Sequence, residues 1–525
     1  MSKKKKQREL FEARKAQQYE EAMAQKRAAQ GSPPAEVPPQ GDGKGLLPFQ
    51  LQPDAGEDEV TGRAGLTLVV EAFRGYRGDD LVRTHLKVKK RARGFSEVEF
   101  VEAFLLLQAE GGEHLEDLAV LGEDGGLFRL LDRQPPSPDA ARTFLLRFHD
   151  ERLIEEAKKN AETAGEKSYV PEESVPLQGL GKVQAELTRR IADPELGTCA
   201  TLDHDATVID SHKQTATWHY KGATGYQPVA VAWAEQDLVV ADEFRDGNVP
   251  AGKDNLRLIK RSFQSLPAWV TEMRFRSDTA CYEESVLKWL VNPERPGGPA
   301  GEIGFTISAD MSKELRAECE QVLEEDASGD PDLPRWKMLD DERADETAEW
   351  SEVAFTPGDW PKDAKPLRYL VLRFLRRQGK LFSSGERVKY LSVVTNREGD
   401  GDELIRWHWK KAGTIEHVHD ETKNGLGAGV LPCAEFGANA AWYRLAMLTY
   451  NVLTAIKRQT LPPGEQKVKV KRLRFLVFDL AARLTSHSRY LFARVKKAAL
   501  ERTRSLGARA YFLLLNRRLA AMPSG

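Results

Sequence analysis

Four carboxylates in three separate parts of the chain have the types and spacing that could do chemistry. Asp203 and Asp205 lie two residues apart in LDHDATVID, and Asp278 ends the segment VTEMRFRSD. Side chains two apart on a β-strand share a face, so Asp203 and Asp205 would project together. Glu416 lies in a polar stretch with helical spacing. If the two strands are neighbours and the helix crosses their ends, three carboxylates converge, and their oxygens suit one or two Mg²⁺ ions.

Two such ions would activate an attacking hydroxyl and stabilise the leaving oxygen in phosphoryl transfer. A capping or solvated role is the ordinary alternative for each Asp. Glu416, His419, Asp420 and Lys423 fall at helical spacing on one stripe. That stripe is polar, and its alternative is a solvated face on which Lys423 pairs with Glu416 or Asp420.

The elements that must position these carboxylates can be read from periodicity. CATLDHDATVID is a predicted strand, and YQPVAVAWAEQDLVVADEF holds two more, joined by a polar turn at 235–237. A helix in KDNLRLIKRSFQSL, a strand ending at Asp278, a helix in YEESVLKWLV and a strand in GEIGFTISADM follow. Three strands and then alternating helix and strand is typical of a ribonuclease-H-like α/β fold.

The remaining segments surround that core. Ser96 with Glu99 predicts a capping box, and Ser137 with Pro138 predicts another helix start. The predicted segments are a disordered basic and Pro/Gly-rich tail (1–60), a helical domain that binds DNA ends (61–190), the first part of the core (191–311), a mostly β insertion (312–399), the second part of the core with a long polar helix from 402 to 424 (400–460), and a basic helical C-terminal region (461–525).

The charge balance gives no global sign of nucleic-acid binding, because 78 Lys and Arg face 80 Asp and Glu. Local charge does. Between 467 and 518, fifteen Lys and Arg face only Asp479 and Glu501, with aromatic residues interleaved. This favours a helical surface that neutralises phosphates; an amphipathic helix that packs or dimerises is the alternative, and both can hold. The basic run at 87–93 is equally compatible with DNA contact and with a solvated bundle.

Membrane and secreted classes are excluded by particular residues. The apolar region 430–456 contains Glu435 and Arg444, which a lipid-spanning helix rarely carries. The basic opening continues as a polar helix, unlike a signal peptide. Four scattered cysteines without a CxxC argue against a zinc ribbon or disulfide framework. We expect a cytoplasmic protein.

Several ordered blocks resemble a known family. LDHDAT, YKGATGYQPVAVAWAE, DEFRDGNVPAG, RSDTACY, TISADM, VVTN and EHVHDETKNGLGAGVLPCAEFGANAAWYRLAMLTYN are similar to the blocks of insertion-sequence DDE transposases (transposase DDE domain group 1). Within the IS-four superfamily, the IS-thirteen-eighty group is the nearest. The resemblance covers roughly residues 62–458.

The resemblance implies roles for individual residues. Asp205, two before Thr207, matches the first family Asp, with Asp203 as the competing assignment; Asp278 matches the second. Glu416 and Lys423 match the acidic and basic members of the family's Tyr, Arg, Glu, Lys signature.

Two signature positions differ. Trp409 stands in place of Tyr, and Ala412 in place of the Arg that holds a terminal phosphate, with Lys411 beside it. The family's insertion typically supplies a Trp that stacks on a flipped base, and such stacking contributes about 1 to 3 kcal/mol. Trp336, Trp350 and Trp360 are the candidates, each with packing as its alternative.

The implied function is that of a transposase that binds the terminal inverted repeats of its element, cleaves DNA with two Mg²⁺ or Mn²⁺ ions and joins the 3′ hydroxyls to a target. Asp205, Asp278 and Glu416 would hold the metals, while Lys423 and Lys411 would contact phosphate. The implied partners are double-stranded DNA and a second copy in a synaptic dimer, on the bacterial nucleoid. A metal-dependent nuclease that cuts without joining, and a decayed or co-opted derivative that only binds DNA, are the alternatives.

Overall fold

The computed structural model describes residues 60–521, except positions 90, 92 and 359 and the ranges 323–333, 340–345, 361–365, 377–381 and 383–385. The tail predicted for 1–60 lies outside the described residues apart from Val60. Residues 58–525 form one compact unit.

A nine-stranded mixed sheet lies at the centre of this unit. Five strands form the half that carries the Asp segments: β7 (Leu238–Glu243), β6 (Val229–Trp233), β2 (Cys199–Ala206), β8 (Glu272–Ser277) and β9 (Ile303–Ala309), in that order. β7, β6 and β2 are antiparallel neighbours, whereas β2, β8 and β9 run parallel. The strands predicted in this region are confirmed, and so is the mixed α/β class.

The other half of the sheet comes from the segment predicted as a β-rich insertion. Its strands are β13 (Val388–Thr395), β12 (Arg368–Arg376), β11 (Glu346–Val353) and β10 (Lys337–Leu339). All are antiparallel to their neighbours, and β13 pairs with β9. These strands therefore extend the core sheet instead of forming a separate one. A small sheet of β3 (Ile209–Asp210), β5 (Thr224–Tyr226) and β4 (Thr217–Trp218) was not predicted.

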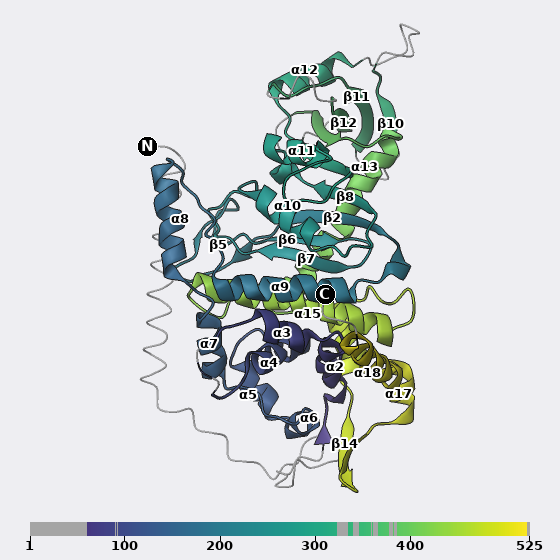
Figure 1. Ribbon diagram of the computed structural model, residues 1–525. Helices are drawn as coiled ribbons and strands as arrows, with labels where there is room; N and C mark the ends of the chain where they lie inside the picture. Colours follow the sequence, from purple (N-terminus) through teal and green to yellow (C-terminus); the bar gives the residue numbers. More distant parts are fainter. Residues whose placement is uncertain are drawn as a thin grey trace, which may run out of the picture. The chain divides into compact units, whose positions relative to one another are not determined.

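Two long helices cover the sheet beside β7. α9 (Val175–Ile191) and α15 (Phe436–Thr460) pack against each other and against this strand, as Figure 1 shows. α15 is buried over almost its whole length, and its buried residues include polar side chains such as Arg444 and Asn451. The Asn451 side chain accepts from the Val239 N–H and donates to the Val239 carbonyl, each at 2.8 Å. This contact satisfies the outer edge of β7, which would otherwise be open to pairing.

Short helices make up most of the described chain before β2. They are α2 (Thr67–Gly75), α3 (Gly78–His85), α4 (Glu97–Glu110), α5 (Asp117–Gly122), α6 (Gly125–Leu130), α7 (Pro138–Leu146) and α8 (Glu151–Thr163). The predicted capping box is present: the Ser96 hydroxyl accepts from the Glu99 N–H, and the Glu99 carboxylate accepts from the Ser96 N–H. Ser137 caps α7 with Pro138 in its first turn, as predicted. The other helices of the core are α10 (Asn255–Gln264), α11 (Glu284–Val291) and α12 (Lys313–Gln321).

The long polar helix predicted for 402–424 is wrong, because the segment is broken into four pieces. These are α13 (Gly401–Trp409), the 3₁₀ turn η4 (Lys410–Gly413), α14 (Ile415–Asp420) and the π turn η5 (Glu421–Gly425). The Thr414 hydroxyl donates to the Lys411 carbonyl at 2.9 Å and to the Asp203 carboxylate. A side chain that bonds locally in this way competes with helix continuation, and Gly413 beside it weakens the helix further.

The wholly helical C-terminal region predicted from charge is also wrong. α16 (Val470–Leu473) and the π turn η6 (Arg474–Phe478) lead into a hairpin of β14 (Ala482–His487) and β15 (Tyr490–Arg494), followed by α17 (Lys497–Thr503) and α18 (Ser505–Ala520). Ser488 and Arg489 both have positive φ, which suits a two-residue hairpin turn that matches strand twist. β14 also pairs with β1 (Val60–Thr61).

Candidate active site at the ends of β2 and β8

The parallel pairing of β2 with β8 brings the first two carboxylate segments together. Asp203 lies opposite Arg276 and His204 opposite Ser277, so Asp205 and Asp278 follow at the carboxyl ends of adjacent strands. Ligand sites of α/β sheets commonly lie at this edge. The negative charge of Asp205 acts on Asp278 across this gap.

The Asp278 carboxyl lies in a low-dielectric position. Burial raises its pKa; the Lys411 ammonium opposes this shift, and the charge of Asp205 adds to it. Its Oδ1 atom also accepts from the Ala280 N–H at 3.1 Å, which fixes the side chain at the start of the turn after β8.

Lys411 is the cation of the site. Its Nζ atom lies 3.1 Å from Asp205 Oδ1, and both side chains are less than one-fifth exposed. His419, on α14, lies on the other side of the same carboxylate, with its Nε2 atom 3.8 Å from Asp205 Oδ2. Burial, together with the charges of Lys423 and Lys411, lowers the pKa of His419 to about 3, so the imidazole is neutral at neutral pH.

Asp203 shares a face with Asp205, as predicted, but has different contacts. Arg276 forms a two-pronged ion pair with it, Nε to Oδ1 at 2.6 Å and Nη2 to Oδ2 at 2.8 Å, and both side chains are fully or almost fully buried. Arg276 also donates to the Trp407 carbonyl at 2.6 Å and lies over the Trp407 ring. Together with Thr414, this pair ties the α13–α14 connection, which carries Lys411, to the sheet.

The polar residues predicted to form one stripe, from Glu416 to Lys423, have different surroundings in the structure. Glu416 is exposed in the first turn of α14, and no hydrogen bond or ion pair joins it to a described residue. Asp420 pairs with Lys469 at 2.7 Å and accepts from Asn424, so the expected Asp420 to Lys423 pair is not what holds it. Lys423 instead donates to Thr207 Oγ1 at 3.2 Å and to the Val208 carbonyl at 2.9 Å. Its pKa is lowered by burial and by Lys221.

The structure therefore brings together Asp205, Asp278 and Lys411, places Lys423 against the Asp205 strand end, and leaves Glu416 outside. Among the described residues, no three His, Cys, Asp or Glu side chains are close enough to hold a metal ion. The donor chemistry nevertheless fits a divalent cation: two hard carboxylates lie at the ends of adjacent strands, and a lysine supplies the counter-charge.

The remaining predicted residues are four Trp side chains and Ala412. Trp350 and Trp360 are buried, whereas Trp336 is half-buried, with the Arg373 guanidinium 4.5 Å from its ring centre. Trp409, at the end of α13, is half-buried against the cluster that contains Trp350. Ala412 is exposed on η4, beside Lys411.

Sequence reasoning missed the supporting roles of Arg276 and Thr414, and gave His419 only a place on a stripe. Arg276 carries a signal: it lies in the buried second half of its strand, after Phe275, and a buried Arg requires a carboxylate partner. Thr414 carries none, because its partner lies 211 residues away.

Comparison with known proteins identifies the family. The model of the transposase DDE domain group 1 matches residues 50–506, so the chain belongs to that family. A cryo-EM structure of the piggyBac transposase synaptic complex with hairpin DNA is similar at 8% identity and a TM-score of 0.42, over 87% of this chain and 80% of that chain. No curated protein matches in sequence. In the described part of the chain, no helix is long and apolar enough to cross a membrane.

Proposed function

We propose that this chain is the transposase of an insertion sequence of the IS-thirteen-eighty group, with a ribonuclease-H-like core, that binds terminal inverted repeats, cleaves DNA and joins the freed 3′ hydroxyls to a target. Family membership supports the class of reaction. The observation that carries the residue assignment is the facing pair Asp205 and Asp278 at the ends of two parallel strands, with Lys411 between helix and sheet as their counter-charge.

Asp205 and Asp278 would hold Mg²⁺ or Mn²⁺, with Glu416 as the third ligand. Glu416 precedes His419 by one helical turn, and His419 lies beside Asp205, which puts Glu416 on the side of α14 nearest the site. The ions supply activation of the attacking hydroxyl and stabilisation of the leaving oxygen. Two ions would be bound.

The chain's own residues would orient the DNA around these carboxylates. Lys411 would exchange its contact with Asp205 for a phosphate oxygen, because a lysine is a mobile point charge. Lys423, held at the strand end through Thr207, would provide a second phosphate contact. We further propose that two copies act together on two element ends, in the cytoplasm on nucleoid DNA.

The decisive experiment uses Asp205→Asn and Asp278→Asn with a duplex that carries the DNA flanking the reading frame. Each variant should lose Mg²⁺- or Mn²⁺-dependent cleavage and joining, yet bind the duplex and unfold like the parent. Asp210→Asn is the matched control: this exposed carboxylate on the following strand pairs with His219, and the variant should cut normally. Cleavage that survives in both active-site variants would contradict the assignment of Asp205 and Asp278 as metal ligands. Cutting without joined products would identify a nuclease.

A second candidate, a derivative that binds DNA without cutting it, is favoured by one pair of observations: Glu416 does not complete a metal-binding cluster of three carboxylates among the described residues, and Ala412 stands where the family has Arg. If the parent protein binds element ends but never cleaves them with either metal, this candidate replaces the first.

A further inference from the structure

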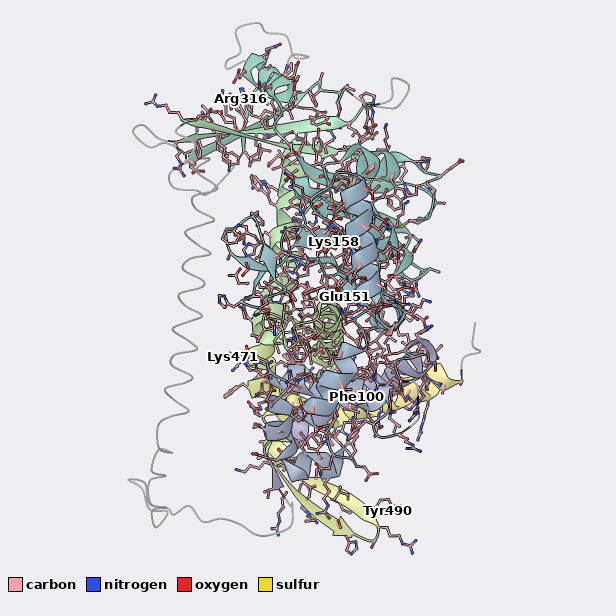
Figure 2. All side chains as sticks on the ribbon, turned by 90° about the vertical axis from the view of Figure 1, so that its left-hand side faces the viewer. Phe100, Glu151, Lys158, Arg316, Lys471 and Tyr490 are labelled. Atoms are coloured by element: carbon pink, nitrogen blue, oxygen red, sulfur yellow. The ribbon has the colours of Figure 1, made fainter. Side chains whose placement is uncertain are left out.

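The hairpin of β14 and β15 is an exposed two-stranded ribbon. Its base is fixed: β1 pairs with Ala482 and Arg483, Leu484 is fully buried, and Arg129 donates to Ser486 Oγ at 2.9 Å. Beyond that base β15 pairs with β14 alone, and every residue of β15 is exposed. Figure 2 shows the ribbon extending away from the neighbouring helices, with Tyr490 near its end.

One face of this ribbon combines arginines with aromatic rings. Residues paired across an antiparallel ladder project to the same side, so one face carries the pairs Arg483 with Arg494, Thr485 with Phe492, and His487 with Tyr490. Tyr490 is 70% exposed and Phe492 46%, and their ring centres are 6.4 Å apart. Leu484 and Ser486 project to the opposite side, toward the body. Large rings left in water on a solvent-facing surface indicate a binding site.

The charge of the ribbon is of one sign. Residues 482–497 contain Arg483, Arg489, Arg494, Lys496 and Lys497 and no carboxylate, in a chain whose net charge is −2. Within the described chain, neither Arg489 nor Arg494 forms an ion pair; Arg494 makes one hydrogen bond, to Thr485 Oγ1 at 3.0 Å. These guanidinium groups therefore carry uncompensated positive charge to the surface.

Resting on the proposed function's premise that the chain acts on duplex DNA, we propose that the β14–β15 ribbon is a DNA-binding element that enters a groove of the duplex with its Arg and aromatic face. A two-stranded ribbon fits the major groove, which is about 12 Å wide. The arginines flanking the ribbon would bind phosphates on the groove walls, while Tyr490 and Phe492 pack against sugars and base edges. This site is separate from the carboxylates at the ends of β2 and β8.

The test compares two ribbon variants with the parent, using a fluorescein-labelled duplex of mixed sequence over a range of salt concentrations. The double substitution Arg489→Gln with Arg494→Gln should make the negative slope of log affinity against log salt shallower by about 1.8, since each phosphate contact contributes about −0.9. Tyr490→Ser with Phe492→Ser should weaken binding at every salt concentration and leave the slope unchanged. The matched control is Lys158→Gln with Lys159→Gln, two exposed cations on α8 that give the same change of charge and should keep the parent slope.

The outcomes separate this inference from the proposed catalytic function. Parent-like slopes in the Arg489 and Arg494 variant, with normal cleavage by the parent, overturn the ribbon inference alone. If the Arg489 and Arg494 variant has a shallower salt dependence of binding but the parent never cleaves DNA, the ribbon inference is supported and the catalytic proposal is wrong. If the ribbon variants change the mass in sedimentation but not the slope, the ribbon binds a second copy, and the inference is wrong.

Discussion

At the residue scale, two carboxylates that look alike in the sequence have different surroundings. Asp203 and Asp205 occupy one face of β2, but Asp203 is fully buried against Arg276, whereas Asp205 is partly exposed beside Lys411. The Asp203–Arg276 pair acts on the fold by holding the α13–α14 connection against the sheet. Asp205 faces the open side, where a cation or phosphate can reach it.

Asp203→Ala should therefore destabilise the protein. Removing one partner of a buried ion pair leaves the Arg276 charge without compensation, which costs about 3 to 5 kcal/mol. Asp205→Ala should destabilise the protein less than Asp203→Ala, because the Lys411 and Asp205 side chains keep 13% and 18% exposure, whereas those of Arg276 and Asp203 keep 3% and 0%. Denaturant unfolding of both variants measures the difference. Parent-like stability of Asp203→Ala together with lost cleavage would show that Asp203, and not Asp205, is the catalytic carboxylate.

At the element scale, the parts that local sequence determines were predicted correctly. The strands β2, β6, β7, β8 and β9 have a period of two or are continuous apolar runs, and the start of α4 carries its own capping residues. The break between α13 and α14 was not predictable, because it depends on Thr414 bonding to a strand 211 residues away. The β14–β15 hairpin was not predicted, because positive charge alone does not distinguish a strand from a helix, although ARLT in β14 alternates apolar and polar residues as a strand does.

Ser96→Ala tests whether the capping box stabilises α4, a helix whose residues are largely buried in the core. The substitution removes the acceptor for the Glu99 N–H and one of the two donors to the Glu99 carboxylate. Loss of such a cap costs about 1 kcal/mol of folding free energy. Chemical denaturation should show that loss, while Ser488→Ala, at an exposed turn position, should unfold like the parent. Equal stability of the two variants would mean that packing alone holds the start of α4.

At the scale of the whole molecule, the C-terminal segment belongs to the body of the protein as well as to its charged surface. The Arg474 side chain donates to the Ala109 carbonyl at 2.6 Å and to the Gln108 carbonyl at 3.1 Å. Phe512 of α18 is buried against α2, where it leaves no room for a side chain at Gly75. The charge pattern alone could not reveal this packing, since the buried residues are spaced among exposed cations. The packing alternative thus holds for part of this segment, and the proposed DNA contact concerns the exposed β14–β15 ribbon.

Removing residues 467–525 should consequently damage the fold and not only the affinity for DNA. The truncation exposes the apolar surface that Leu473, Val477, Phe478 and Phe512 now cover, each of which contributes about 1.5 to 3 kcal/mol when buried. We expect a lower melting temperature and aggregation. The control replaces only Thr485–Phe492 with Asn-Gly, which keeps buried Leu484 and a tight turn, and this variant should melt like the parent while binding duplex DNA less tightly. Scanning calorimetry and anisotropy measure the two properties separately. A truncated protein that melts like the parent would show that the packed helices contribute nothing to stability, and weak binding would then be attributable to lost charge alone.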